Sequence, residues 1–287
     1  MRRQFIMRAA LCAGSVGLLA ALAAGGGEVR RAGAVPGKVS RVVSLSPSIT
    51  RQVVDLGAED SLAGVTNYHP AMQKNVPVVS SIVLPNIELI FSLRPDAVLL
   101  SGSDVIAAHA PRMEALGLAV RRFGKNEGFD DIIANYRELA ALLGKGREAE
   151  GKIESYRREL GSIRKARGAR CAFFVSHGPI VAAGGKSFIG AVIRDAGGSN
   201  VYGGIDIAYP IVSLETIVER DPDVIISMMP GAAEFFAKAP EEVPGVKALR
   251  GRVFSVGDEH LPYYTPRDYL ASVRAVAEIL RNAEGGR

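Results

Sequence analysis

The sequence NIELIFSLRPDAVLLS at residues 86–101 decides the fold, because it recurs as SLETIVERDPDVIIS at residues 213–227. The two copies align without a gap, and their matched residues include Glu88 with Glu215, Ile90 with Ile217 and Asp96 with Asp223. Each copy opens with an N-cap residue, followed two positions later by a carboxylate that favours the positive end of a helix. Proline then ends the helix and turns the chain into an apolar strand. The repeat predicts two halves that are built alike.

Short apolar runs alternate with amphipathic segments around both copies. The expected strands lie at residues 41–45, 62–66, 96–100, 119–123, 171–175, 223–227 and 252–256. The expected helices lie at residues 48–56, 86–94, 104–116, 129–143, 147–167, 187–196, 213–221, 231–238 and 266–282. This alternation predicts largely parallel sheets covered by helices. Two such lobes leave a cleft between them, which is a favoured position for a ligand.

A long charged helix is expected between the two halves, at residues 147–167. Its apolar stripe is narrow, which suits a strut laid across two lobes better than a buried core helix. An ordinary crossover helix within one domain is the alternative. The fold class is therefore α/β, with two Rossmann-like lobes bridged by one long α-helix. The expected divisions are an export segment and linker at 1–34, an N-terminal lobe at 35–144, a bridging helix at 145–168 and a C-terminal lobe at 169–287.

The first 34 residues have the character of an export signal. Arg2, Arg3 and Arg8 precede an apolar run at residues 9–24 that is short and rich in Ala and Gly. Small-x-small cleavage sites follow at residues 21–23 and 32–34, and the paired arginines partly match a twin-arginine signal. The sequence thus predicts an exported, periplasmic protein, with an uncleaved N-terminal anchor as the alternative.

Charge and cysteine content exclude several classes of protein. The 287-residue chain has a formal net charge of +5, but residues 1–34 hold five of the 35 basic and one of the 30 acidic residues. Cleavage after Ala34 leaves 30 basic and 29 acidic residues, so basicity is no argument for nucleic-acid or membrane binding. Cys171 is then the only cysteine left, and its apolar run CAFFV indicates a buried thiol.

Four motifs in order resemble one family. They are RVVSLSPSIT (41–50), NIELIFSLRPDAVLL (86–100), GGKSFIGAVIRDAGGSNVY (184–202) and YPIVSLETIVERDPDVII (209–226). The chain from about Arg41 to Leu280 is similar to the periplasmic binding proteins for cobalamin and ferric siderophores, the class III fold with a helical backbone. The resemblance implies a substrate-binding protein of an ABC importer, a monomer without catalysis or an intrinsic cofactor. Its ligand would be a metal chelate: a ferric siderophore, cobalamin or another corrinoid, or haem.

The resemblance also implies a docking role for Glu88 and Glu215, one on each lobe, toward arginines of the membrane permease. Exposed carboxylates can form bidentate contacts with arginine. Without the resemblance, both would be interpreted as first-turn acids that stabilise their helices. One departure from the family pattern is Arg51, which stands where Glu often follows SPSIT.

The cleft is expected at loops that follow the carboxyl ends of strands. These loops lie at residues 46–48, 66–70, 80–85, 176–179, 207–210 and 258–267. The chain has no Trp, so a flat macrocycle would pack on Tyr rings. Arg267 could meet an anionic group of the ligand. The candidate ligand-binding residues are Ser46, Pro47, Tyr68, His69, His177, Tyr209, Tyr263, Tyr264 and Arg267.

Two alternative ligands remain open on the same architecture. His69, His177 and His260, with Asp258 and Glu259, could bind bare Zn²⁺ or Mn²⁺, although their spacing fits no compact zinc motif. Haem could take Tyr68 or His69 as axial ligand.

Other function classes find less support. The sequence has no G-x-G-x-x-G after a strand and no G-x-S-x-G, and VAAGGKSF (181–188) lacks the spacing of a phosphate-binding loop. An α/β enzyme is therefore disfavoured. A binding module for signalling differs from a transport receptor only in whether the paired glutamates dock on a permease.

Overall fold

The computed structural model describes residues 37–72, 75–229, 231–236, 252–256 and 263–285. The expected export segment at 1–34, the end of the helix expected at 231–238 and the candidate residues 258–260 lie outside the described residues.

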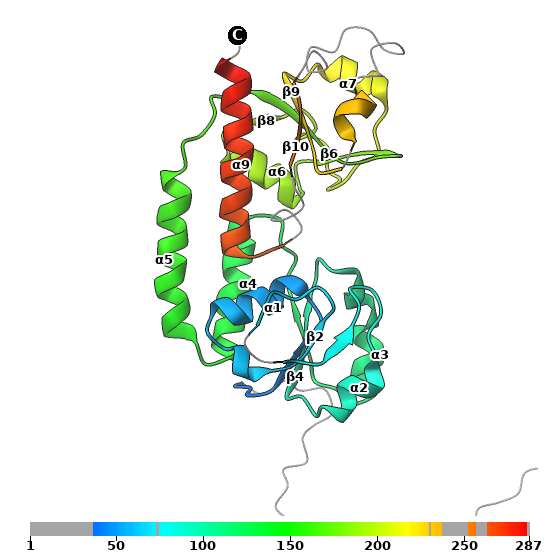
Figure 1. Cartoon of the computed structure of the whole chain (residues 1–287), viewed down its shortest axis with the longest axis vertical. Helices are drawn as coiled ribbons and strands as arrows, with labels where there is room; N and C mark the ends of the chain where they lie inside the picture. The colour runs from blue at the N-terminus through cyan, green and yellow to red at the C-terminus, as the bar shows by residue number, and fades with distance from the viewer. Residues whose placement is uncertain (1–36, 73–74, 230, 237–251, 257–262, 286–287) are drawn as a thin grey trace, which may run out of the picture. The chain divides into compact units, whose positions relative to one another are not determined.

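The N-terminal lobe is built on five parallel strands in the order β3-β2-β1-β4-β5. The strands are β1 (Val42–Ser44), β2 (Leu62–Thr66), β3 (Val78–Ser80), β4 (Ala97–Ser101) and β5 (Val120–Phe123). The helices are α1 (Pro47–Asp55), α2 (Ile87–Ser92), α3 (Ala110–Ala115) and α4 (Phe129–Leu142), with 3₁₀ turns η1 (Glu59–Ser61) and η2 (Val105–His109). Figure 1 shows these elements in blue to green.

Alternate strand residues face opposite sides of this sheet, as the period of two requires. Val42 and Leu99 pack in one hydrophobic cluster with residues of α1 and α4. Val43 and Val98 pack in another cluster with residues of α2, η2 and α3. The sheet is therefore doubly wound, and its strand order reverses between β1 and β4.

The C-terminal lobe is built on a second sheet in the order β10-β9-β6-β7, with β8 paired to β6. The strands are β6 (Arg170–His177), β7 (Ile180–Ala182), β8 (Ser199–Asn200), β9 (Val224–Ser227) and β10 (Val253–Ser255). All pairings are parallel except β6 with β7. Helices α6 (Phe188–Asp195), α7 (Leu214–Arg220) and α9 (Pro266–Gly285) accompany them, and residues 232–236 are also helical.

Helices α4, α5 (Gly146–Ser162) and α9 pack against one another. Their buried side chains belong to one hydrophobic cluster that includes Leu99 of β4 and Phe173 of β6. The amphipathic stripe of α5 is buried as expected: Ile153 and Tyr156 are 2% and 7% exposed. The long bridging helix thus exists, and it packs on α4 of the N-terminal lobe and on α9 of the C-terminal lobe.

Some element bounds differ from the expected ones. Helix α5 ends at Ser162 rather than Arg167, because Ile163 turns extended and its side chain packs into the core. Strands β3, β7 and β8 were not expected. Each has only two or three residues, which is too short for an alternating pattern to be recognised.

The sequence repeat is also a repeat of local structure. The side chains of Asn86 and Ser213 accept hydrogen bonds from the backbone N–H three residues later and so cap α2 and α7. Arg94 and Asp221, each just before the Pro-Asp pair, both adopt a left-handed backbone conformation, with φ of 45° and 37°. Two non-glycine residues in this sparsely populated region at matched positions show that the two segments turn in the same way.

Candidate functional site

The site begins at the point where the strand order of the first sheet reverses. In doubly wound sheets, ligands bind outside the carboxyl ends of the two strands that flank such a point. Here those strands are β1 and β4, which are hydrogen-bonded neighbours. The loops after them place Ser46 and Asp104 at this edge of the sheet.

Ser46 is fully buried and stands at the N-cap position of α1, but its side chain makes no capping hydrogen bond. Among the described residues, its Oγ atom and Oδ2 of Asp104 have no hydrogen-bond partner of ordinary geometry, although the two side chains lie close to each other. Burial raises the pKa of the Asp104 carboxyl, and the Ser46 hydroxyl partly opposes that rise. A buried hydroxyl and a half-buried carboxyl therefore lie close together at the reversal point, without the well-formed hydrogen bonds that buried polar atoms usually make.

Tyr264 brings the C-terminal part of the chain to the same place. Its backbone N–H donates to Oγ of Ser48 at 3.0 Å, and its carbonyl oxygen accepts from Nε2 of Gln52 at 2.7 Å. Burial and the Asp104 carboxylate raise the pKa of the Tyr264 phenol. Phe188 of α6 packs against the ring edge-to-face at 5.1 Å. Tyr264 thus joins α1 of one lobe to α6 of the other.

Tyr209 is a second tyrosine near Tyr264, from the loop that precedes α7. It is 41% exposed, yet burial of its phenol and the neighbouring Tyr264 raise its pKa. Its loop lies close against Gly184, where a Cβ atom would stand 2.0 Å from the carbonyl oxygen of Ile207. Glycine at this position lets the loop approach. We call Ser46, Asp104, Tyr209 and Tyr264 the edge cluster.

Tyr263 lies against Arg51, the residue that departs from the family pattern. The Arg51 guanidinium lies over the Tyr263 ring at 3.7 Å, and its Nη1 is 3.8 Å from Oδ1 of Asp268. The positive charge of Arg51, in the middle of α1, is thereby matched by an aromatic face and a carboxylate. Pro47, the first residue of α1, is half-buried.

The remaining candidates lie apart from the edge cluster or make other contacts. Tyr68 is 57% exposed, and exposed His69 has its Nδ1 atom 2.8 Å from the carbonyl oxygen of Pro70. The ring of His177, the last residue of β6, stacks on Phe235 with centroids 4.9 Å apart. Within the described part of the chain, no group of three or more His, Cys, Asp or Glu side chains could hold a metal ion.

Arg267 lies in a different pocket, lined by residues of α1, α4, α5 and α9. Its guanidinium is 3.4 Å from Oδ1 of Asp55. Oδ2 of Asp55 also accepts hydrogen bonds from the phenols of Tyr136 and Tyr156, and Lys152 lies 3.5 Å from Oδ1. The structure therefore gives Arg267 a partner at a junction of four helices.

Glu88 and Glu215 each occupy the first turn of a capped helix, in α2 and α7, and both side chains are exposed. The pKa of Glu215 is lowered because Ser213 and its own backbone N–H stabilise the carboxylate. Each glutamate is available to a partner from solvent.

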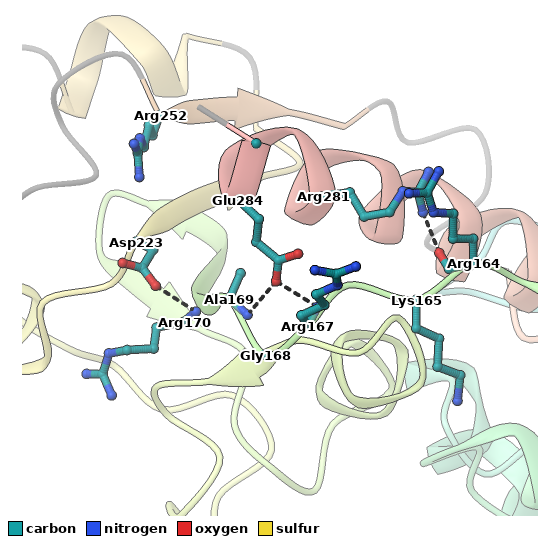
Figure 2. Close-up of a pocket in the computed structure, with 11 residues that line it drawn as sticks. Arg164, Lys165, Arg167, Gly168, Ala169, Arg170, Asp223, Arg252, Arg281 and Glu284 are labelled. Atoms are coloured by element: carbon teal, nitrogen blue, oxygen red, sulfur yellow. Dashed lines mark hydrogen bonds between the residues drawn. The ribbon is translucent and has the colours of Figure 1, made fainter. Parts of the chain in front are cut away.

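A large basic pocket lies elsewhere in the C-terminal lobe, with a cavity volume of about 1000 Å³ (Figure 2). Its walls carry Arg164, Lys165, Arg167, Arg170, Arg252 and Arg281. The Glu284 carboxylate accepts hydrogen bonds from two backbone N–H groups there, those of Arg167 and Ala169. Since Arg170 begins β6, this pocket lies at the amino edge of its sheet, away from the carboxyl edge where ligands bind. None of the candidate residues expected from the sequence lines this pocket, although the basic run RKARGAR (164–170) supplies much of its wall.

Asp104 was also missed. The signal for it was the position of SGSD at 101–104, directly after an expected strand. Asp104 lies at the candidate site only because β4 pairs with β1. The local sequence does not predict which strands are neighbours in the sheet.

Two α/β lobes thus place polar and aromatic groups at the carboxyl edge of the first sheet, an arrangement that suits ligand binding. Comparisons with known proteins agree: residues 42–259 match the family model described as periplasmic binding protein. The chain belongs to the periplasmic binding protein family and is a substrate-binding receptor.

Similar proteins include the cobalamin-binding protein of Halobacterium salinarum, 29% identical over 244 residues, which cover 79% of this chain and 66% of the relative. Solved structures with the same fold include the periplasmic vitamin B12 binding protein BtuF of Vibrio cholerae, with a TM-score of 0.72 and 22% identity over 87% of this chain and 99% of that one. The apo periplasmic heme-binding protein RhuT from Roseiflexus sp. RS-1 has a TM-score of 0.71 and 21% identity over 85% and 99%. These structures support the class III fold.

No helix within the described ranges has both the length and the apolar character that a membrane span requires.

Proposed function

We propose that the chain is the substrate-binding protein of an ABC importer and that it captures cobalamin or a related corrinoid at the edge cluster. The observation that carries this proposal is that Ser46 and Asp104 follow the two strands between which the order reverses, and that a hydrogen bond to Ser48 holds Tyr264 beside them. Tyr209 interacts electrostatically with Tyr264. A flat macrocycle can pack on tyrosine rings while its periphery meets the buried polar groups.

The corrinoid is favoured over the other metal chelates by the cobalamin-binding protein of Halobacterium salinarum, the relative with the higher identity among those described. The heme-binding structure shares only the fold with this chain, and pocket loops diverge among proteins that share a fold. Ferric siderophores and haem are therefore the competing ligands that an experiment must include.

Delivery to the membrane is proposed to use Glu88 and Glu215. Both lie at matched positions of the repeat, exposed on the first turn of a short helix. Two carboxylates, one from each lobe, can dock on arginines of a permease and fix the orientation of the receptor on it.

The proposed layout follows from this role. Residues 1–34 direct export to the periplasm, residues 35–144 and 169–287 form the two lobes, and residues 145–168 bridge them. Packing of α4, α5 and α9 against one another resists bending more than flexible crossovers would, so closure on the ligand is proposed to be small.

The proposal is tested by recording the absorption spectrum of the exported protein as purified and then dialysing it against cyanocobalamin, haemin and a ferric siderophore in parallel. Retention of cyanocobalamin at one molecule per chain, in excess over the other two, is the expected result. Preferential retention of haemin or of the ferric siderophore would replace the corrinoid as ligand. Retention of none of the three would overturn the binding of a metal chelate.

A further inference from the structure

Two buried polar atoms of the edge cluster, Ser46 Oγ and Asp104 Oδ2, have no hydrogen-bond partner of ordinary geometry in the described part of the chain. Buried polar atoms in native proteins are nearly always paired, and each exception calls for a reason. Unlike the Ser46 hydroxyl, the ionised Asp104 carboxylate can only accept hydrogen bonds, so any group that pairs with it must be a donor.

The Asp104 side chain does not cap the turn that its own backbone forms. Asp104 stands at the N-cap position of η2, yet its carboxylate makes no capping hydrogen bond. Its backbone holds the turn instead: the N–H donates to the Ser101 carbonyl at 3.1 Å, and the carbonyl accepts from the Ala107 N–H at 3.1 Å. Among the described residues, no Lys, Arg or His forms an ion pair with it. The position of Asp104 is thus fixed by main-chain contacts and not by its carboxyl.

The carboxyl lies among residues that are proposed to contact the ligand. Ser46 and Tyr264 both interact with it electrostatically, and Tyr209 is next to Tyr264. Asn126, which is 7% exposed, lies nearby on the same edge: its N–H donates to Ser103 Oγ at 3.0 Å. Besides the Ser46 hydroxyl, the ionised carboxyl has acceptor capacity for a further donor, and no cation of the described residues pairs with it.

We propose that Asp104 is a specificity-determining residue, whose carboxyl accepts a hydrogen bond from an N–H group of the ligand and so selects an amide-edged corrinoid over chelates edged with carboxylates. This inference rests on the proposed function and deepens it. The periphery of a corrinoid such as cobalamin carries primary amides, whose N–H groups can pair with the Asp104 carboxyl. A carboxylate at the same place offers no donor and adds like charge in a partly desolvated site.

The test compares two corrinoids that differ in their periphery, dicyanocobinamide with amides and dicyanocobyrinic acid with carboxylates. Isothermal titration gives the affinity of each for the wild type, for Asp104→Asn and for Asp104→Ala. Asp130→Asn is the matched control, because that aspartate side chain is 91% exposed on the first turn of α4. Circular dichroism of each variant shows whether it is folded.

The wild type is expected to bind the amide form more tightly than the carboxylate form. Asp104→Asn supplies an N–H donor and removes the charge. The ratio of the affinities for dicyanocobinamide and dicyanocobyrinic acid should therefore fall by about 10-fold or more. Asp104→Ala should weaken binding of dicyanocobinamide by about 10-fold, since it removes the acceptor. Asp130→Asn should leave both affinities unchanged.

The inference and the proposed function can fail separately. If the wild type binds dicyanocobinamide and the preference is the same in Asp104→Asn, then the role of Asp104 is overturned while the corrinoid receptor stands. If the wild type binds neither corrinoid but retains haemin or a ferric siderophore, then both are overturned.

Discussion

The carboxylates of Asp96 and Asp223 make the same contact in the two halves of the chain. Oδ2 of each accepts a hydrogen bond from the backbone N–H of an arginine at the start of a strand, Arg41 at 3.0 Å and Arg170 at 3.1 Å. The guanidinium of each arginine in turn donates to a carbonyl oxygen at the end of the helix that precedes the aspartate. The repeated motif is therefore a structural unit that ties a helix end to a strand start, once in each lobe.

Asp55 is predicted to be a main contributor to the stability of the helical junction. Its Oδ2 atom accepts hydrogen bonds from the phenols of Tyr136, fully buried, and Tyr156. Asp55→Ala leaves both phenols without this acceptor and should lower the free energy of unfolding by about 2–4 kcal/mol, measured by urea denaturation. Glu150→Ala, which removes a solvent-exposed ion pair with Arg137, is the control and should have little effect. Equal losses in the two variants would contradict the role of Asp55.

Stability is predicted to fall at high pH through Tyr156. Burial and the Asp55 carboxylate raise the pKa of its phenol to about 12, whereas an unfolded tyrosine ionises near 10. The folded state keeps the proton to higher pH, so the stabilisation is fully present below about pH 10 and is lost as the pH rises toward 12. Urea denaturation at about pH 9 and pH 11 should show this loss, and Tyr156→Phe should make it smaller. An identical pH dependence in the variant would count against this account.

Charge reversal at Glu88 and Glu215 is predicted to separate binding from delivery. The double variant Glu88→Arg, Glu215→Arg should retain ligand affinity but reduce transport by the reconstituted permease by about 10-fold or more, because like charges would face its arginines. Glu219→Arg is the matched control, since Glu219 is exposed on the same helix α7. Full transport with the double variant would show that the receptor does not dock through this pair.

Tyr209 is predicted to contribute a packing face for the ligand. Tyr209→Ala should weaken corrinoid binding by roughly 10-fold in isothermal titration, whereas Tyr209→Phe should retain most of the affinity. Ile207→Ala tests the same loop, because Ile207 is 59% exposed and lies two residues away. If the Ile207 and Tyr209 variants weaken binding equally, the effect belongs to the loop and not to the aromatic ring.

Much of the fold could be predicted from local sequence. The strands at β1, β2, β4, β6 and β9 are continuous apolar runs, and the Pro-Asp pairs mark where each helix ends and a strand begins. The end of α5 was harder to predict from the sequence. Residues 164–167 are as highly charged as the helix before them, but Ile163 turns into the core and ends the helix earlier.

The candidate site was only partly accessible, because long-range contacts decide it. Loops at strand ends predicted a site at Ser46 and Tyr264, and the structure joins these segments by a hydrogen bond from the Tyr264 N–H to Oγ of Ser48. Arg267 was expected near the ligand, yet its contact is with Asp55, 212 residues earlier in the chain. The importance of Asp104 depends on the position of β4 beside β1, which only the assembled sheet reveals.

The central claim, that a corrinoid binds at the edge cluster, is tested most directly by a crystal structure of the mature protein grown with cyanocobalamin. The macrocycle is predicted to lie within about 4 Å of the Tyr209 and Tyr264 rings, with an amide N–H directed at the Asp104 carboxyl. A corrinoid bound instead in the basic pocket of Figure 2, or a structure with no corrinoid density at β1 and β4, would contradict the account.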